Sequence, residues 1–130
     1  MTFVVLLVTL FDDERAIYSN CLRSKGHGVL IADGPEHALR LAAQASPDVV
    51  VTRILQPGQS MNGLELLRHL KRDPLTGHVP VIVITSLMQP EFRAEAMAAG
   101  CDGYLLLPVL PDTLIEEIRR VLPAAARTVA

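Results

Sequence analysis

The chain has 130 residues, half of them apolar, with no tryptophan and a formal net charge of −2. That length suits one domain with a core of its own, built mainly from aliphatic side chains. The small charge and the scattered basic residues give no electrostatic reason to expect nucleic acid or anionic lipid as a partner. We therefore expect no nucleic-acid binding through this domain.

The apolar run at residues 3–8 has no basic segment before it, and acidic residues follow it at once, so we predict neither a signal peptide nor a membrane span. Cys21 and Cys101 lie far apart without metal-ligand spacing, which favours two reduced thiols packed as small apolar groups. Four histidines also lack ligand spacing, and we expect all of them to be exposed: His27, His37, His69 and His78. These features predict a cytoplasmic protein with no metal or other cofactor.

Five short apolar runs alternate with five segments of helical spacing. In chain order, the predicted strands and helices cover residues 3–8, 12–25, 29–32, 35–45, 49–52, 63–71, 81–85, 91–99, 104–107 and 111–122. In the first helix we expect Ile17, Cys21 and Leu22 to form the apolar stripe. The strand segments are nearly continuous in Val, Ile and Leu, which is typical of a parallel sheet covered on both faces.

Strict alternation with short connections predicts a doubly wound α/β fold, with helices on both faces of a five-stranded parallel sheet. We assign residues 1–122 to this domain and residues 123–130 to a C-terminal tail or the start of a linker. In such folds, ligands bind beyond the carboxyl ends of the strands. The residues at those ends are the candidates for function: Thr9, Leu10, Arg53, Thr85 and Leu107.

Several stretches of sequence carry a family resemblance in a fixed order. They are PDVVV at 47–51 followed by Pro57, NGLELL at 62–67, PVIVITS at 80–86, and AGCDGYL at 99–105 followed by Pro108. Together they resemble the receiver domain of two-component response regulators, the CheY-like family, over nearly the whole chain. The resemblance implies a flavodoxin-like sheet with the strand order 2-1-3-4-5. Only the loop at 56–62 departs in length, being longer than the common pattern.

Members of this family bind Mg²⁺ through two acidic residues after the first strand and an aspartate after the third, and that aspartate accepts a phosphoryl group. A Thr or Ser after the fourth strand and a Lys after the fifth contact the phosphoryl oxygens. By the resemblance, these positions fall on Thr9 and Leu10, on Arg53, on Thr85 and on Leu107. A guanidinium has no nucleophilic lone pair at neutral pH and repels Mg²⁺. The resemblance therefore implies a degenerate receiver that neither binds Mg²⁺ nor accepts a phosphoryl group, with only Thr85 retained.

A second alignment of the first strand is open, because Asp12, Asp13 and Glu14 look like the missing acidic residues. Using them would shorten the first helix by nearly a full turn, so we favour the alignment without gaps. Asp12 and Asp13 then lie at the amino end of the first helix, where carboxylates cap N–H groups and suit the helix dipole. Both alignments leave Arg53 and Leu107 in place.

A buried Arg53 needs a partner for its charge, because an unpaired buried ion costs several kcal/mol. We expect Asp12 or Asp13 beside it, and the alternative is a guanidinium that reaches solvent at the pocket mouth. Tyr104 also has two interpretations. It is either the switch aromatic that the resemblance implies, moving together with Thr85, or an amphipathic side chain at the rim with a solvated hydroxyl.

The usual partner surface of this family is built from the fourth helix, the fifth strand and the fifth helix. Here it would carry Met88, Phe92, Met97 and Leu106. We therefore predict a receiver module that acts in two-component signalling through protein contacts. One such contact would be a homodimer formed through this face. One alternative is a regulatory fragment of a larger response regulator or hybrid kinase that is also independent of phosphate. Another is an ordinary phosphoreceiver with a displaced site. The chain has no Gly-rich phosphate loop and no Ser/His/Asp set, so we expect no enzyme.

Overall fold

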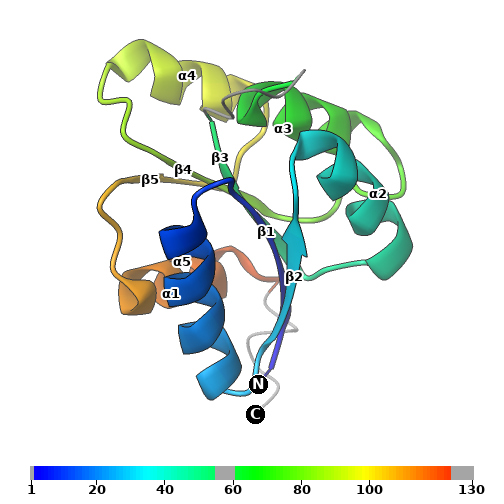
Figure 1. The fold of residues 1–130 in the computed structure, drawn as a ribbon. Coiled ribbons are helices and arrows are strands. Elements are labelled where there is room, and N and C mark those ends of the chain that lie inside the picture. The colour runs from blue at the N-terminus through cyan, green and yellow to red at the C-terminus, as the bar shows by residue number, and fades with distance from the viewer. Residues whose placement is uncertain (1, 55–60, 124–130) are drawn as a thin grey trace.

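The computed structural model describes residues 2–54 and 61–123, in which five strands and five helices alternate. Their bounds are β1 Val4–Val8, α1 Asp12–Ser24, β2 Gly28–Ala32, α2 Pro35–Ala45, β3 Val49–Arg53, α3 Gly63–Arg72, β4 Val81–Thr85, α4 Pro90–Ala98, β5 Gly103–Leu106 and α5 Pro111–Val121. Parallel pairing joins the strands in the order β2-β1-β3-β4-β5. The predicted doubly wound α/β fold and its flavodoxin-like strand order are therefore confirmed (Figure 1).

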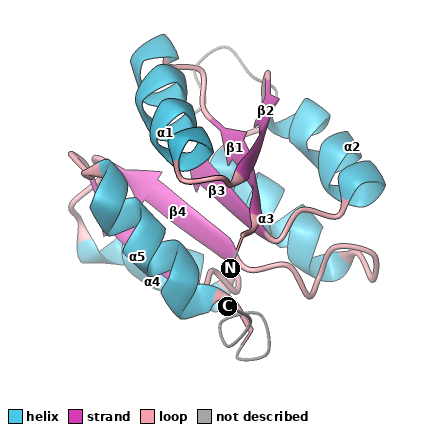
Figure 2. Ribbon diagram, turned by 90° about the horizontal axis from the view of Figure 1, so that it is seen from below, coloured by secondary structure: helices cyan, strands magenta, loops and turns pink. Residues whose placement is uncertain are grey.

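Helices cover the sheet on both faces, and the side chains of each strand alternate between them. On β1, Val5 and Leu7 pack in the cluster that includes residues of α1 and α5, whereas Leu6 and Val8 pack with residues of α2, α3 and α4. Figure 2 shows α1 and α5 on one side of the sheet and α2 and α3 on the other. Because both faces are covered, the strands are almost wholly apolar.

The predicted elements differ from the observed ones by at most one residue at either end. The packing of α1 differs in one respect from the prediction. Ile17, expected on the apolar stripe, is 54% exposed, whereas Tyr18 and Leu22 are buried. The buried stripe can hold a tyrosine because its hydroxyl donates a hydrogen bond to the carbonyl of Val109 at 2.8 Å.

Two predicted segments are described only in part. The tail at 123–130 is described at its first residue alone, and the loop at 56–62 at its last two residues; the rest of both lies outside the described residues. Cys21 and Cys101 are free thiols, as predicted, and Cys101 is buried. Within residues 2–54 and 61–123, no helix has both the length and the apolar character needed to cross a membrane.

The exposure predicted for all four histidines is correct for His69 and His78 only. His37 is half-buried, and its Nδ1 accepts a main-chain N–H at 3.0 Å. His27 is 5% exposed, because its ring stacks on the ring of Phe3 at the amino end of the sheet. The prediction for His27 is therefore wrong.

The amino end of α3 packs against the carboxyl end of β3. Asn62 caps the helix by accepting the N–H of Glu65 at 2.9 Å, and the Glu65 side chain accepts the N–H of Asn62 in return. Gly63 has no room for a side chain, since a Cβ would lie 1.8 Å from the carbonyl oxygen of Arg53. The N–H of Gly63 also donates to the carbonyl of Ile54 at 2.7 Å. Helix α3 thereby fixes the backbone around Arg53.

Candidate functional site

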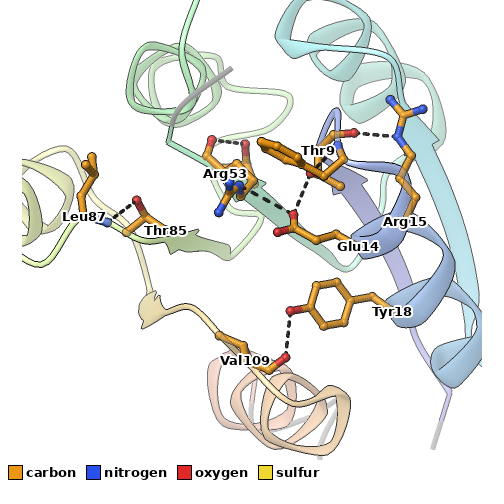
Figure 3. A network of polar contacts seen from close by, with 10 residues as sticks. Thr9, Glu14, Arg15, Tyr18, Arg53, Thr85, Leu87 and Val109 are labelled. Carbon is orange, nitrogen blue, oxygen red and sulfur yellow. Dashed lines mark hydrogen bonds and ion pairs between the residues drawn. The ribbon is translucent and has the colours of Figure 1, made fainter. Parts of the chain in front are cut away.

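The predicted site residues gather at the carboxyl edge of the sheet. Thr9 and Leu10 follow β1, Arg53 ends β3, Thr85 ends β4, and Leu107 follows β5. The N–H of Leu107 donates to the carbonyl of Thr85 at 2.8 Å, which holds these two strand ends together. Because the strands are parallel, their carboxyl ends lie at one edge, and Figure 3 shows Thr9, Arg53 and Thr85 there.

Thr9 is fully buried and uses its hydroxyl twice. Its Oγ1 donates to Oε1 of Glu14 at 2.8 Å and accepts the N–H of Phe11 at 3.2 Å. Its carbonyl accepts from Nε of Arg15 at 2.7 Å. Leu10, the next residue, is half-buried and offers no polar side-chain atom. Thr9 therefore anchors the first turn of α1 and holds the carboxylate of Glu14 at the end of β1.

Arg53 lies beside that same carboxylate. Its side chain is 12% exposed, and its Nε is 3.7 Å from Oε1 of Glu14, whose side chain is 19% exposed. The guanidinium carbon also lies 4.4 Å from the ring centre of Phe11, a distance at which a cation is attracted to the ring. One oxygen of Glu14 thus faces both Thr9 and Arg53 (Figure 3). The arginine charge is balanced within the fold.

We predicted Asp12 or Asp13 as the partner of Arg53, and this prediction is wrong, because the carboxylate beside Arg53 belongs to Glu14. Both aspartates are exposed, and the side chain of Asp12, at 96% exposure, lies 4.0 Å from Arg15. Successive residues of a helix point in directions about 100° apart, so only one carboxylate of the acidic run can face the sheet. Glu14 does so because it lies one turn before the buried Tyr18.

The predicted capping role of Asp12 and Asp13 also needs correction. Helix α1 begins at Asp12, so its N-cap residue is Phe11, which makes no side-chain capping bond. Asp12, Asp13 and Glu14 all lie in the first helical turn, where their charges suit the helix dipole.

Tyr18 extends the cluster toward the segment after β5. This residue of α1 is buried, and its hydroxyl donates to the carbonyl of Val109 (Figure 3). Burial and the nearby charge of Glu14 raise the pKa of Tyr18 above its ordinary value, while Arg53 opposes that rise. Leu107 packs against the apolar cluster on this face of the sheet. The position after β5 therefore brings an alkyl side chain and no charge.

Thr85 and Tyr104 both bind the main chain of Leu87, in the turn between β4 and α4. Oγ1 of Thr85 accepts the N–H of Leu87 at 3.1 Å, and the hydroxyl of Tyr104 donates to its carbonyl at 3.2 Å. The guanidinium of Arg93 lies 5.8 Å from the ring centre of Tyr104. Burial, with a smaller contribution from Cys101, raises the pKa of Tyr104, and Arg93 opposes it. The hydroxyl of Tyr104 is thus bonded to the protein, unlike the solvated hydroxyl of the second interpretation.

The predicted partner surface is only partly exposed. Met88 is 79%, Met97 48% and Leu106 47% exposed, whereas Phe92 is half-buried. A surface pocket of about 420 Å³ lies between α4, β5 and α5, and Arg93, Met97, Asp102, Gly103, Tyr104, Glu117 and Arg120 line it. This surface therefore combines apolar side chains with charges of both signs, and Tyr104 connects it to the β4–α4 turn.

Two residues of the site were not predicted as partners of Arg53, namely Phe11 and Glu14. Glu14 belongs to the acidic run already singled out, and its spacing of four from Tyr18 is a usable signal once Tyr18 is placed in the core. For Phe11 the sequence offers no comparable signal, because the side chain of a phenylalanine after a strand ordinarily packs in the core or at its edge.

The comparisons with known proteins agree with the fold. Residues 5–119 match the sequence profile of the response regulator receiver domain. The chain is 37% identical over 118 residues to Protein PilH of Pseudomonas aeruginosa, covering 91% of this chain and 96% of PilH. It is 34% identical over 118 residues to chemotaxis protein CheY-3 of Vibrio cholerae, covering 90% of this chain and 89% of CheY-3.

Other relatives extend beyond a single domain. The chain is 30% identical over 118 residues to the phosphate regulon transcriptional regulatory protein PhoB of Pseudomonas aeruginosa, covering 88% of this chain and 51% of PhoB. Among solved structures, chemotaxis protein CheY4 of Vibrio cholerae superposes with a TM-score of 0.86 at 29% identity, covering 94% of this chain and all of CheY4. The chain belongs to the response regulator receiver domain family of two-component signalling.

Proposed function

We propose that this chain is a receiver module that does not accept a phosphoryl group and acts through contact with a partner protein. The observation that carries the proposal is the ion pair between Arg53, at the end of β3, and Glu14 in α1. By the family resemblance, Arg53 stands where the phosphate-accepting aspartate is expected. A guanidinium cannot act as the nucleophile at neutral pH, so the first step of the family's chemistry has no acceptor at this position.

The donor atoms at this edge do not fit Mg²⁺. The ion requires near-octahedral oxygen ligands, which receiver domains supply with carboxylates. Here the carboxylate of Glu14 already faces the guanidinium of Arg53 and accepts from Thr9. A divalent cation beside Glu14 would also lie close to the fixed positive charge of Arg53. Among the described residues, no group of three or more His, Cys, Asp and Glu side chains could hold a metal ion.

The charge at the centre of the site favours a constant state. A phosphorylated aspartate would bring negative charge to the end of β3, and Arg53 brings a permanent positive charge whose counter-charge is internal. Thr85 accepts the N–H of Leu87 and Tyr104 donates to its carbonyl, so both polar main-chain groups of this residue are bonded within the fold. We infer that the β4–α4 turn, and the surface that Tyr104 joins to it, keep one arrangement independently of phosphate.

The surface on α4, β5 and α5 is the proposed contact with the partner. Met88, Met97 and Leu106 supply exposed apolar area, and the charged side chains around the pocket supply specificity. No catalytic role is proposed for the chain. A relative of nearly the same length, PilH, supports a stand-alone module. A longer relative, PhoB, supports a regulatory part of a larger protein.

The phosphate-independent state is tested by NMR with Mg²⁺ and fluoroberyllate, which imitates a phosphoryl group on an aspartate. We expect no ligand-dependent shift in the amides of Thr9, Arg53, Thr85 and Leu87. A receiver with aspartate at the acceptor position serves as positive control under the same conditions. Saturable shifts centred on Arg53 and Thr85 would contradict the proposal and restore the ordinary phosphoreceiver.

The partner surface is tested with a matched pair of variants. Leu106→Glu places a charge on the proposed contact, and Leu75→Glu places one at a similarly apolar exposed position after α3. We expect Leu106→Glu to abolish binding of the native partner from the source cells and Leu75→Glu to preserve it. Equal binding by both variants would contradict the proposal that this surface contacts the partner. Sedimentation of the purified chain shows whether the partner is a second copy of this chain.

A further inference from the structure

His27 lies in the turn between α1 and β2, at the end of the sheet opposite Arg53. It is 5% exposed, and its ring stacks on Phe3 with 3.7 Å between ring centres and 13° between ring planes. Two main-chain bonds of 3.0 Å close the turn, from His27 N–H to the carbonyl of Leu22 and from Gly28 N–H to the carbonyl of Phe3. The imidazole is therefore held between the end of α1 and the start of β1.

The two ring nitrogens of His27 have different surroundings. Nδ1 accepts the N–H of Phe3 at 3.3 Å, so this nitrogen carries no proton in the folded chain. The ring proton is then on Nε2, which is buried and has no hydrogen-bond partner among the described residues. The site accepts a neutral imidazole in one tautomer.

The described charges that act on His27 are positive. They come from Arg119 on α5 and from Lys25 in its own turn. Two carboxylates at this end are engaged elsewhere: Asp112 pairs with Lys25 at 3.6 Å, and Asp48 accepts a main-chain N–H of β1 at 2.7 Å. Burial first, and then these positive charges, hold the pKa of His27 below its ordinary value of 6.5.

We propose that His27 is an acid-sensitive latch: in its neutral form it fixes the first residues of β1 to the α1–β2 turn, and on protonation it releases them. A proton on Nδ1 would point at the N–H of Phe3, so two donors would meet where one hydrogen bond existed. The new charge would also be buried among positive groups without solvation. Separation of the imidazole from Phe3 relieves both costs, at the point where β1 and β2 begin to pair.

The direction of the pH effect follows from proton linkage. The folded chain keeps His27 neutral, whereas the unfolded chain binds a proton below the ordinary pKa of 6.5. The contribution of His27 to stability is therefore fully present above pH 6.5 and is lost as the pH falls below it. In that range the unfolding equilibrium constant rises by up to about tenfold per pH unit, until the pKa of the folded state is reached.

The test combines an NMR titration of the folded wild-type chain with urea unfolding between about pH 8 and about pH 5. We expect the ring of His27 to titrate below pH 6.5, and the amide of Phe3 to shift along the same curve. His27→Asn keeps an acceptor for Phe3 but cannot titrate, so we expect it to lose the wild-type steepening of unfolding below pH 6.5. His69→Asn, at an exposed ring, should keep the wild-type slope.

Two results would overturn the latch. One is an equal pH dependence of unfolding in wild type and His27→Asn, and the other is a His27 ring that titrates at or above pH 6.5 in the folded chain. The ring titration uses the wild-type protein alone, so it decides the question even if the Asn variant does not fold. Neither measurement depends on whether the chain accepts a phosphoryl group.

Discussion

The two ends of the sheet each bury an ionisable side chain beside a phenylalanine ring, but they deal with its charge in opposite ways. At the carboxyl end, Arg53 lies near the ring of Phe11 with the carboxylate of Glu14 at 3.7 Å. At the amino end, His27 stacks on Phe3 among positive charges. An arginine cannot lose its charge, so the fold supplies a counter-charge, whereas a histidine can be held neutral. The first arrangement keeps a fixed positive charge, and the second depends on an imidazole that stays neutral.

The largest expected effect comes from removing the counter-charge of Arg53. Glu14→Gln keeps the side-chain length and an acceptor for Thr9 but removes the negative charge. We expect the free energy of unfolding to fall by about 3 kcal/mol, because a mostly buried ion pair loses one partner. Urea unfolding at neutral pH measures the change.

The control for this variant is Asp13→Asn, which removes an exposed carboxylate one residue earlier in the same turn. It should change the free energy of unfolding by no more than about 0.5 kcal/mol. Arg53→Met combined with Glu14→Gln should recover most of the loss, because an apolar replacement leaves no buried charge to neutralise. A double variant as unstable as Glu14→Gln alone would argue against the pair.

A smaller effect is expected at the amino end. His27→Phe keeps a ring to stack on Phe3 but removes the acceptor of its N–H, which lowers the free energy of unfolding by about 1–2 kcal/mol at slightly alkaline pH. The difference between wild type and His27→Phe should shrink as the pH falls below 6.5, because only the wild-type chain has an imidazole at this position. A difference that stays the same down to mildly acidic pH would contradict the role given to His27.

The smallest effect concerns the ring over Arg53. Phe11→Leu keeps apolar contact but removes the aromatic face, and since Phe11 is 41% exposed we expect a loss of about 0.5–1 kcal/mol. Ile17→Leu, at an exposed apolar position of the neighbouring helix α1, is the control and should be nearly neutral. If the two variants have the same stability, the ring contributes nothing specific to Arg53.

The fold was predictable because its signals are local and repeated. Continuous Val, Ile and Leu runs indicate strands buried on both faces, and the glycines and prolines at the helix ends set the boundaries. The identity of the partner of Arg53 was not predictable in the same way. Asp12, Asp13 and Glu14 are consecutive acids, and only the rotation of α1 against the sheet decides which of them faces inward.

His27 shows a second limit of sequence reasoning. A histidine in a short turn between a helix and a strand is ordinarily exposed, and no periodicity predicts otherwise. Here Gly26 adopts a left-handed φ of +88° after α1, and the chain then places the imidazole on Phe3, a residue 24 positions away. Contacts of this kind depend on the tertiary arrangement, so the sequence alone does not contain a visible signal for them.

The proposal that Arg53 keeps this receiver independent of phosphate can be checked by intact-mass measurement after treatment with Mg²⁺ and a small phosphodonor. The wild-type chain is compared with a variant that carries Leu10→Asp, Arg53→Asp and Leu107→Lys, which restores the family's chemistry at the three positions. We predict no added phosphoryl group on the wild type and one on the restored variant. A wild-type chain that gains a phosphoryl group under these conditions would contradict it.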